Sequence, residues 1–292
     1  MELRVLRYFL AVAQEGSISG AAEYLHLTQP TLSRQLMDLE EELGKKLFIR
    51  GSRRVHLTED GQFLRKRASE IVELVEKTES ELLDTEEGIA GDIYIGGGES
   101  EAMRLIARGA GRLRKVYPGI HYHLFSGNAG DVCERLDRGC LDFGVLLGPE
   151  PGDLSRYDYM KLPCRDVWGV VMREDSELAE RESIRAEDLW DKPLLLSRQA
   201  MGKDSLTAWF GRSYTDLNVA ATYNLIFNAA LMVEEGLGYA VTLEHLVNSE
   251  RLCFRPLEPR LEVGLYVVWK KFQVFSKAAA KFLAVLQEQK CS

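Results

Sequence analysis

Apolar residues in the first part of the chain recur every three or four positions, which is the spacing of amphipathic helices. In the first predicted helix this stripe consists of Leu3, Leu6, Phe9, Leu10 and Ala13. Gly16 then ends the helix, and Ser17 or Ser19 can cap a second one. The inner face of that second helix consists of Ala21, Ala22 and Leu25, and its small residues allow helices to cross closely.

A third helix is predicted to follow the turn at residues 26–27. Thr28 is its expected N-cap, and Pro30 falls in its first turn, where the N–H that proline lacks would have no partner inside the helix. Its buried stripe is formed by four leucines, namely Leu32, Leu36, Leu39 and Leu43. Polar side chains therefore occupy the other faces of its N-terminal half, and they are Gln29, Thr31, Ser33 and Arg34.

These outward groups are of the kind that reads a DNA major groove. Arg can donate two hydrogen bonds to guanine, Gln can bond bidentately to adenine, and Ser or Thr can reach a phosphate or a base edge. On an isolated helix the same residues are ordinary solvated side chains, so the neighbouring features decide between the two interpretations.

Two short apolar segments follow at residues 47–49 and 55–57, and each is typical of a β-strand. The turn between them contains Gly51 and three arginines, which are Arg50, Arg53 and Arg54. Such a hairpin is a wing, whose arginines can enter a minor groove or hold the DNA backbone. We therefore predict a winged helix-turn-helix over residues 1–58.

The distribution of charge agrees with this placement. The 292 residues carry a net charge of −8, which by itself argues against a nucleic-acid partner. Residues 1–58, however, hold eight basic and seven acidic side chains, a net +1, so the remainder carries −9. From Lys45 to Arg54 there are five basic residues and no acidic one, a patch that suits phosphates. The acidic body would repel DNA except at this end.

The stretch from Phe9 to Gly61 resembles the DNA-binding domain of LysR-type transcriptional regulators. It matches that family in the Ala-Ala pair, the Gln-Pro entry, the Ser-Arg step, Leu-Glu followed by Leu-Gly, Leu-Phe-x-Arg and the final Leu-Thr. Thr31 departs from the pattern, because alanine or serine is usual there. The resemblance implies DNA contact by Thr28, Gln29, Thr31, Ser33 and Arg34 on the recognition helix, and by Arg50, Arg53 and Arg54 in the wing.

A long linker helix is predicted next, because residues 58–87 contain no proline and only one glycine. Apolar positions alternate by four and three, the spacing of a coiled coil, at Leu64, Ala68, Ile71, Val75, Thr78 and Leu82. A narrow seam on a charged helix favours pairing with a second copy, and packing on its own chain is the alternative. In the family this helix makes the dimer, so the resemblance implies a homodimer or homotetramer. We assign residues 59–90 to this helix and its hinge.

Short apolar strands alternate with helices over residues 91–292, which predicts an α/β domain with a parallel sheet covered on both faces. The order resembles the two-lobed effector domain of the same regulators, which is similar to periplasmic binding proteins. The best matches are LDFGVLLG and VEEGLGYAV. We place the first lobe at residues 91–161 plus 265–292 and the second at 162–264.

Small ligands bind such domains where strand ends and helix N-termini meet at a cleft. The sequence places six polar residues at such positions, namely Ser100, Asn128, Ser197, Arg198, Thr222 and Asn224. Each of them can instead be an ordinary N-cap. Hydroxyls with an arginine suit a carboxylate, but Glu99 and Glu101 flank Ser100 and oppose an anion. A neutral or amine-bearing effector therefore stays open.

Other chemistry finds little support. The five cysteines are scattered without a C-x-x-C pair, so we expect no disulfide, metal or cofactor. No apolar stretch approaches the roughly 20 residues that span a bilayer, which favours the cytoplasm. A solute-capture protein or an enzyme is the alternative, but the glycines at 96–98 lack a following Lys-Ser/Thr, and His121 and His123 are more often structural than metal ligands. We predict an effector-controlled regulator of promoter DNA, with RNA polymerase as a possible further partner.

Overall fold

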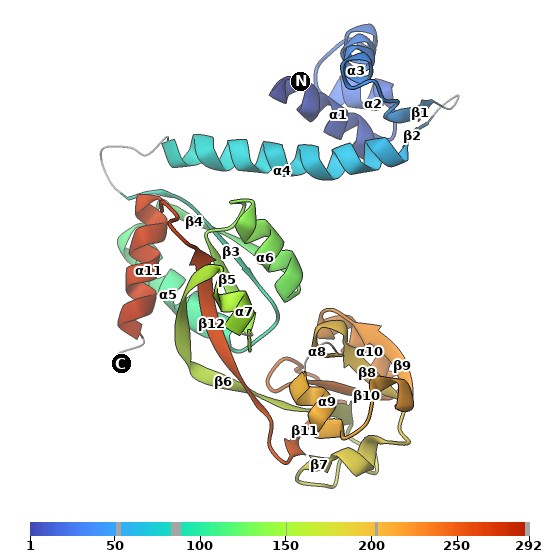
Figure 1. Cartoon of the computed structure of the whole chain (residues 1–292), viewed down its shortest axis with the longest axis vertical. Coiled ribbons are helices and arrows are strands. Elements are labelled where there is room, and N and C mark those ends of the chain that lie inside the picture. Colours follow the sequence, from blue (N-terminus) through green and yellow to red (C-terminus); the bar gives the residue numbers. More distant parts are fainter. Residues whose placement is uncertain (51–53, 83–88, 150, 202–203, 290–292) are drawn as a thin grey trace. The chain divides into compact units, whose positions relative to one another are not determined.

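The computed structural model describes residues 1–50, 54–82, 89–149, 151–201 and 204–289, and the chain divides into two compact units, Met1–Leu83 and Asp84–Ser292. The first unit contains three short helices, a two-stranded hairpin and one long helix (Figure 1). In chain order these are α1 (Leu3–Glu15), α2 (Ile18–Tyr24), α3 (Gln29–Leu43), β1 (Phe48–Arg50), β2 (Val55–Leu57) and α4 (Glu59–Leu82). This is the winged helix-turn-helix with a linker helix that the sequence predicts.

The predicted end of α1 and the predicted starts of α2 and α3 are confirmed, whereas the predicted end of the linker helix, at residues 83–87, lies outside the described residues. Gly16 adopts a left-handed conformation (φ 62°) and donates its N–H to the Val12 carbonyl, which closes α1. Ser17 caps α2, because its Oγ accepts the Gly20 N–H at 3.2 Å. Thr28 caps α3, and proline occupies the first turn of that helix.

The core of the first unit forms where α1, α2 and α3 meet. Its buried apolar residues include Leu6, Phe9, Val12, Ala21, Ala22, Leu32, Leu36 and Leu39. The prediction for Leu43 is wrong, since this side chain is 38% exposed. Leu43 is the last residue of α3, and the chain turns away at Gly44, so the buried stripe ends at Leu39.

Helix α4 packs on its own unit, which revises the interpretation of its seam. Ala68 is fully buried, and Leu64 and Val72 pack partly buried against the core that α1 helps to form. These positions are therefore occupied within one chain. Three large apolar side chains of α4 stay exposed, namely Phe63, Ile71 and Leu74, and of these Ile71 belongs to the predicted seam.

The second unit has two lobes, each with three parallel strands. The first lobe contains β3 (Gly91–Gly97), α5 (Ala102–Val116), β4 (Ile120–Ser126), α6 (Ala129–Asp137), β5 (Phe143–Leu147), α7 (Pro151–Leu154) and α11 (Lys277–Gln289). Strands β4, β3 and β5 are parallel. Helices α5 and α11 share one core with this sheet, and α6 belongs to a second core that includes Val132, Leu136, Leu146 and Val268. The sheet is thus covered on both faces, as predicted.

The second lobe repeats this plan with β9, β8 and β10 in parallel. Its elements are β7 (Ile184–Arg185), η1 (Ala186–Leu189), β8 (Leu194–Ser197), α8 (Arg198–Met201), α9 (Asp204–Phe210), η2 (Tyr214–Asp216), β9 (Val219–Tyr223), α10 (Ile226–Glu234), β10 (Tyr239–Leu243) and β11 (Leu252–Glu258). Strand β11 has no counterpart in the sequence prediction, which assigned no element to that segment.

Two antiparallel strands, β6 (Tyr157–Arg173) and β12 (Glu262–Lys270), join the lobes (Figure 1). The sheet order is β4-β3-β5-β12-β6-β10-β8-β9, so β6 contributes to both lobes. The predicted lobe boundaries at 161–162 and 264–265 fall inside these strands, and β12 has an irregular register between Gly264 and Tyr266. A purely parallel sheet was therefore wrong at the crossing, because apolar alternation does not report strand direction. Among the described residues no helix has the length and hydropathy of a membrane span.

Candidate functional site

The N-terminal half of α3 presents polar side chains to solvent. Gln29, Thr31 and Arg34 are exposed, and Ser33 is half-buried. The exposed Thr28 is occupied as the cap: its Oγ1 accepts the Thr31 N–H at 3.4 Å and lies 2.8 Å from the Thr31 Oγ1. Gln29 and Arg34 are therefore the long side chains that can reach outward, while the two threonine hydroxyls form a pair beside them.

The wing is anchored at its base. Strands β1 and β2 pair in antiparallel register from Phe48↔Leu57 to Arg50↔Val55. The Val55 N–H donates to the Gly16 carbonyl at 2.8 Å, which joins β2 to the end of α1. Arg50 ends β1, and Arg54 is exposed just before β2. Arg53 lies outside the described residues.

A buried carboxylate connects the recognition helix to the wing. Glu40, on α3, is 4% exposed, and its Oε1 accepts the N–H groups of Leu47 (2.8 Å) and Phe48 (3.2 Å). Its Oε2 accepts from Lys46 Nζ at 2.9 Å. Burial raises the pKa of Glu40, but these hydrogen bonds outweigh it and hold that pKa below its ordinary value. The sequence carried the signal, because residue 40 continues the face of Leu36 one turn later.

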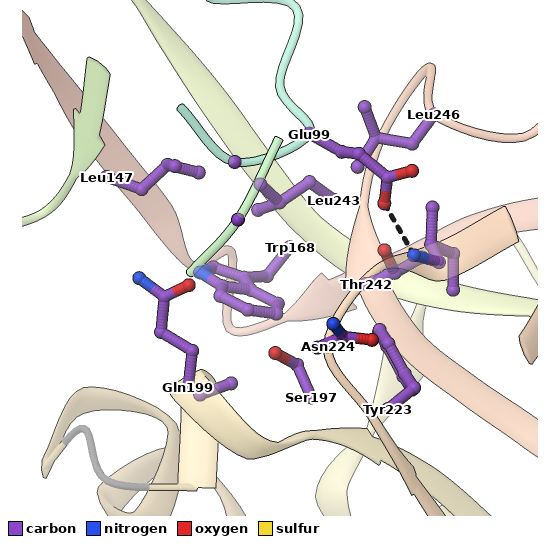
Figure 2. A pocket seen from close by; sticks show the side chains of 14 residues that line it. Glu99, Leu147, Trp168, Ser197, Gln199, Tyr223, Asn224, Thr242, Leu243 and Leu246 are labelled. Carbon is purple, nitrogen blue, oxygen red and sulfur yellow. Dashed lines mark hydrogen bonds between the residues drawn. The ribbon is translucent and has the colours of Figure 1, made fainter. Parts of the chain in front are cut away.

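In the second unit a pocket of about 550 Å³, its open mouth included, lies between the two lobes (Figure 2). Gly98, Glu99, Gly127 and Leu147 line it from the first lobe. The second lobe supplies the other wall, with Trp168, Ser197, Gln199, Ala200, Tyr223, Asn224, Ile226, Thr242, Leu243 and Leu246. The strand ends thus meet at a cleft, as the two-lobed architecture requires.

Of the six predicted effector contacts, Ser197 and Asn224 line this pocket and four do not. Ser100 is buried, and its Oγ accepts the Ala102 N–H at 3.0 Å. Asn128 caps α6 by accepting the Asp131 N–H at 3.0 Å.

Arg198 and Thr222 also lie outside the lining. The Arg198 Nε donates to the Thr222 Oγ1 at 3.3 Å, so each of these side chains is engaged with the other. Local pattern predicted helix starts and strand ends correctly, but each of these four side chains forms a hydrogen bond within the chain and none lines this pocket.

Several lining side chains are not among the predicted contacts. Trp168 lies on β6 and Thr242 on β10, and both segments belong to the short apolar strands that the sequence predicts. Thr242 offered a signal, because it is a polar residue inside the run YAVTL. Tyr223 lies between two predicted residues, and its hydroxyl donates to the Val241 carbonyl at 2.6 Å. Burial raises the pKa of Tyr223.

Glu99 connects the two lobes across the pocket. One carboxylate oxygen accepts the Ile226 N–H at 2.5 Å, the bond drawn in Figure 2. Ile226 is the first residue of α10, whose N-cap residue, Leu225, provides no side-chain hydrogen bond. Glu99 therefore satisfies the helix end from the other lobe.

A second buried carboxylate lies on β6. Asp166 is 1% exposed, and its Oδ2 has no hydrogen-bond partner among the described residues. Burial raises the pKa of Asp166, and a hydrogen bond with Ser100 opposes that shift without cancelling it. No group of three His, Cys, Asp or Glu side chains in the described part of the chain is placed to hold a metal ion.

Comparisons with known proteins agree with both units. Residues 3–62 match the family model for the bacterial regulatory helix-turn-helix protein, lysR family, and residues 86–290 match the LysR substrate binding domain. The Hca operon transcriptional activator HcaR of Escherichia coli is 30% identical, with 100% of this chain and 99% of that protein covered. The uncharacterized regulator YvbU of Bacillus subtilis is 27% identical over 99% of this chain and 98% of its own.

Solved structures share the fold. The regulator CbnR bound to its target DNA aligns with a TM-score of 0.76 at 19% identity, covering 99% of both chains. Full-length BenM aligns with a TM-score of 0.55 at 24% identity, covering 100% of this chain and 97% of that one.

Glu40→Gln should loosen the wing. Gln retains only one acceptor oxygen where the carboxylate accepts three bonds, so we expect local stability to fall by about 1–3 kcal/mol. Hydrogen exchange of the full chain should then be faster at the Leu47 and Phe48 amides. The exposed neighbour provides the control, as Glu41→Gln. Since the folded pKa is lowered, the difference between wild type and Glu40→Gln should vanish as the pH falls through that pKa. Equal exchange in the two variants would contradict this role.

Asp166→Asn should stabilise the second unit at neutral pH. A raised pKa in the folded state means that the ionised carboxylate costs stability above the ordinary value of 3.8. Removing the charge should therefore raise the melting temperature at pH 7, and the gain should shrink as the pH falls toward 3.8. Thermal unfolding at several pH values, with exposed Asp158→Asn as control, measures this. A lower melting temperature for Asp166→Asn at pH 7 would refute it.

Proposed function

This chain belongs to the LysR family of DNA-binding transcriptional regulators with a substrate-binding domain, and from that premise we propose how it recognises DNA and what controls it. Helix α3 enters the major groove, and its polar N-terminal half contacts the site through Thr28, Gln29, Thr31, Ser33 and Arg34. The observation that carries this assignment is the exposed N-terminal half of α3, together with the hydrogen bonds of Glu40 that hold α3 beside the wing.

The two elements have different roles in this proposal. Arg34 and Gln29 are long enough to bond base edges in pairs, whereas the paired hydroxyls of Thr28 and Thr31 suit a phosphate. The wing arginines, Arg50, Arg53 and Arg54, hold the DNA backbone or the minor groove and so add affinity without sequence preference.

A small effector binds between the lobes of the second unit, where Ser197 and Asn224 supply polar contacts and Trp168 an apolar wall. Closure of the lobes on that molecule would change the grip on DNA, because a ligand that prefers one arrangement shifts the population toward it. Ser100, Asn128, Arg198 and Thr222 act in this proposal by shaping the surrounding helix ends and loops.

The working protein is at least a homodimer. The side chains of Phe63, Ile71 and Leu74 fall within one narrow stripe of α4 and are 65%, 39% and 41% exposed. A second copy would cover this stripe and place two recognition helices on one site of two half-sites. Further association to a tetramer and contact with RNA polymerase belong to the same proposal.

We assign no catalytic activity to the chain and place its action in the cytoplasm, where its DNA target lies. An enzyme or a solute-capture protein has no use for the helix-turn-helix, which the match over residues 3–62 identifies. Members of this family regulate transcription, and the pocket serves that role as a sensor.

Arg34→Ala and Arg54→Ala should weaken DNA binding in different ways. Losing a base contact should cost roughly 1–3 kcal/mol on the specific site and relax the sequence preference. Losing a phosphate contact at Arg54 should weaken specific and random DNA alike and reduce the salt slope by about 1. Binding titrations on both kinds of DNA at several salt concentrations separate the two effects. Equal losses for Arg34→Ala on specific and random DNA would refute base reading.

Leu74→Glu should reduce the mass of the oligomer in solution, because it buries a charge in the proposed contact between copies. Sedimentation at micromolar concentration measures that mass. Gln62→Glu is the control, since it adds the same charge to α4 at an exposed position off the stripe. Unchanged sedimentation of Leu74→Glu would place the contact between copies elsewhere.

A further inference from the structure

The lining of the pocket between the lobes carries negative charge only. Fourteen residues line it, and Glu99 is the one among them with a charged side chain. The remaining polar groups of the lining side chains are uncharged: the hydroxyls and amides of Ser197, Gln199, Tyr223, Asn224 and Thr242, and the indole N–H of Trp168. A ligand in this pocket therefore meets a carboxylate without a neighbouring lysine, arginine or histidine in the lining.

Three helices near the cleft, α5, α6 and α10, already have an acidic side chain of the chain at their N-termini. The first N–H of α10 donates to Glu99. Asp131 is in the first turn of α6, and Glu101 is the residue at the start of α5. Helix N-termini usually attract anions, and here that attraction is offset within the protein.

Two arginines near the lining in sequence form hydrogen bonds within the chain and are not part of the lining. Arg198 lies between two lining residues, but its guanidinium donates to Thr222 and it is not part of the lining. Arg104 donates two hydrogen bonds to Glu101, at 2.7 and 2.9 Å. An anionic ligand would thus enter a pocket whose one charged lining side chain, Glu99, repels it.

The pocket does offer what an organic cation needs. A carboxylate can accept several hydrogen bonds, so Glu99 can receive an ammonium N–H while still holding the Ile226 N–H. Figure 2 shows the indole of Trp168 and the side chains of Leu147 and Leu243 around the same space as Glu99. Aromatic and apolar walls suit the carbon skeleton of an amine and, at the ring face, its charge.

We infer that the effector is a small organic amine, bound through its ammonium group to Glu99, with its apolar part against Trp168. This inference rests on the proposed function of the pocket as the effector site. It also couples the ligand to regulation, because the ammonium binds the same carboxylate that joins the two lobes through Ile226. The charge of the ligand then acts directly on the arrangement of the lobes.

A panel with matched carbon skeletons tests the charge preference. Benzylamine, benzamide and benzoate, and likewise butylamine, butyramide and butyrate, are titrated against the full chain at neutral pH, with binding read from calorimetry and thermal shift. We expect at least one amine to bind about tenfold or more tightly than its amide and carboxylate, the value of a charge-assisted hydrogen bond.

Two glutamate variants locate the preference. Glu99→Gln keeps an acceptor for the Ile226 N–H but removes the charge, so it should abolish the amine preference. Glu101→Gln removes a charge two residues away, at a side chain outside this pocket, and should leave the preference intact. Tighter binding of a carboxylate, no binding by any amine, or equal preference in wild type and Glu99→Gln would each overturn the inference.

DNA binding by the same samples separates this inference from the function it rests on. A protein that retards promoter DNA, and whose retardation responds to the carboxylates and not to the amines, would retain its proposed function and lose the inference. A protein that binds an amine through Glu99 but no DNA would lose the proposed function alone.

Discussion

The carboxylate of Glu40 is the contact on which the proposed mode of DNA recognition depends. If α3 reads a DNA groove while the wing holds the DNA backbone, the two elements must keep a fixed geometry. Glu40, on α3, accepts hydrogen bonds from the Leu47 and Phe48 N–H groups at the start of the wing. It does so from a buried position, where its charge is stabilised by two N–H groups and Lys46. A buried carboxylate with partners on all sides is rigid because losing any one of them is costly.

In the second unit, too, a carboxylate joins two separate structural elements. Glu99 accepts the first N–H of α10 from the opposite lobe, so a carboxylate again satisfies a backbone group that its own element leaves unpaired. Strands β6 and β12 hold the two lobes together through the sheet, and Glu99 bonds across the pocket that they leave open. Rigid strands with a polar bond across the cleft are suited to a sensor that closes on a ligand.

Local physical chemistry explains which features the sequence predicts. A glycine that adopts a left-handed conformation, a capping hydroxyl and a proline in a first turn act within a few residues, and so Gly16, Ser17, Thr28 and Pro30 could be placed from sequence. The strand–helix alternation likewise predicted an α/β domain, and the family resemblance supplied its division into two lobes. The family resemblance supplied the DNA-contact set, which local pattern alone leaves equal to a solvated helix face.

Contacts between distant segments explain what the sequence does not predict. Leu64 and Ala68 have the spacing of an intermolecular seam, yet they pack on their own unit, because periodicity identifies a face and not its partner. The pocket lining depends on such contacts as well. Trp168 and Thr242 line the pocket from strands whose sequences are largely apolar, whereas Asn128 caps its own helix and is not in the lining.

Footprinting of the purified protein on genomic fragments that it selects tests the central claim most directly. The account predicts protection of a defined sequence that contains two related half-sites about one helical turn apart, or a multiple of that distance. Retention of all fragments without a shared protected sequence, or no retention at low salt, would contradict it.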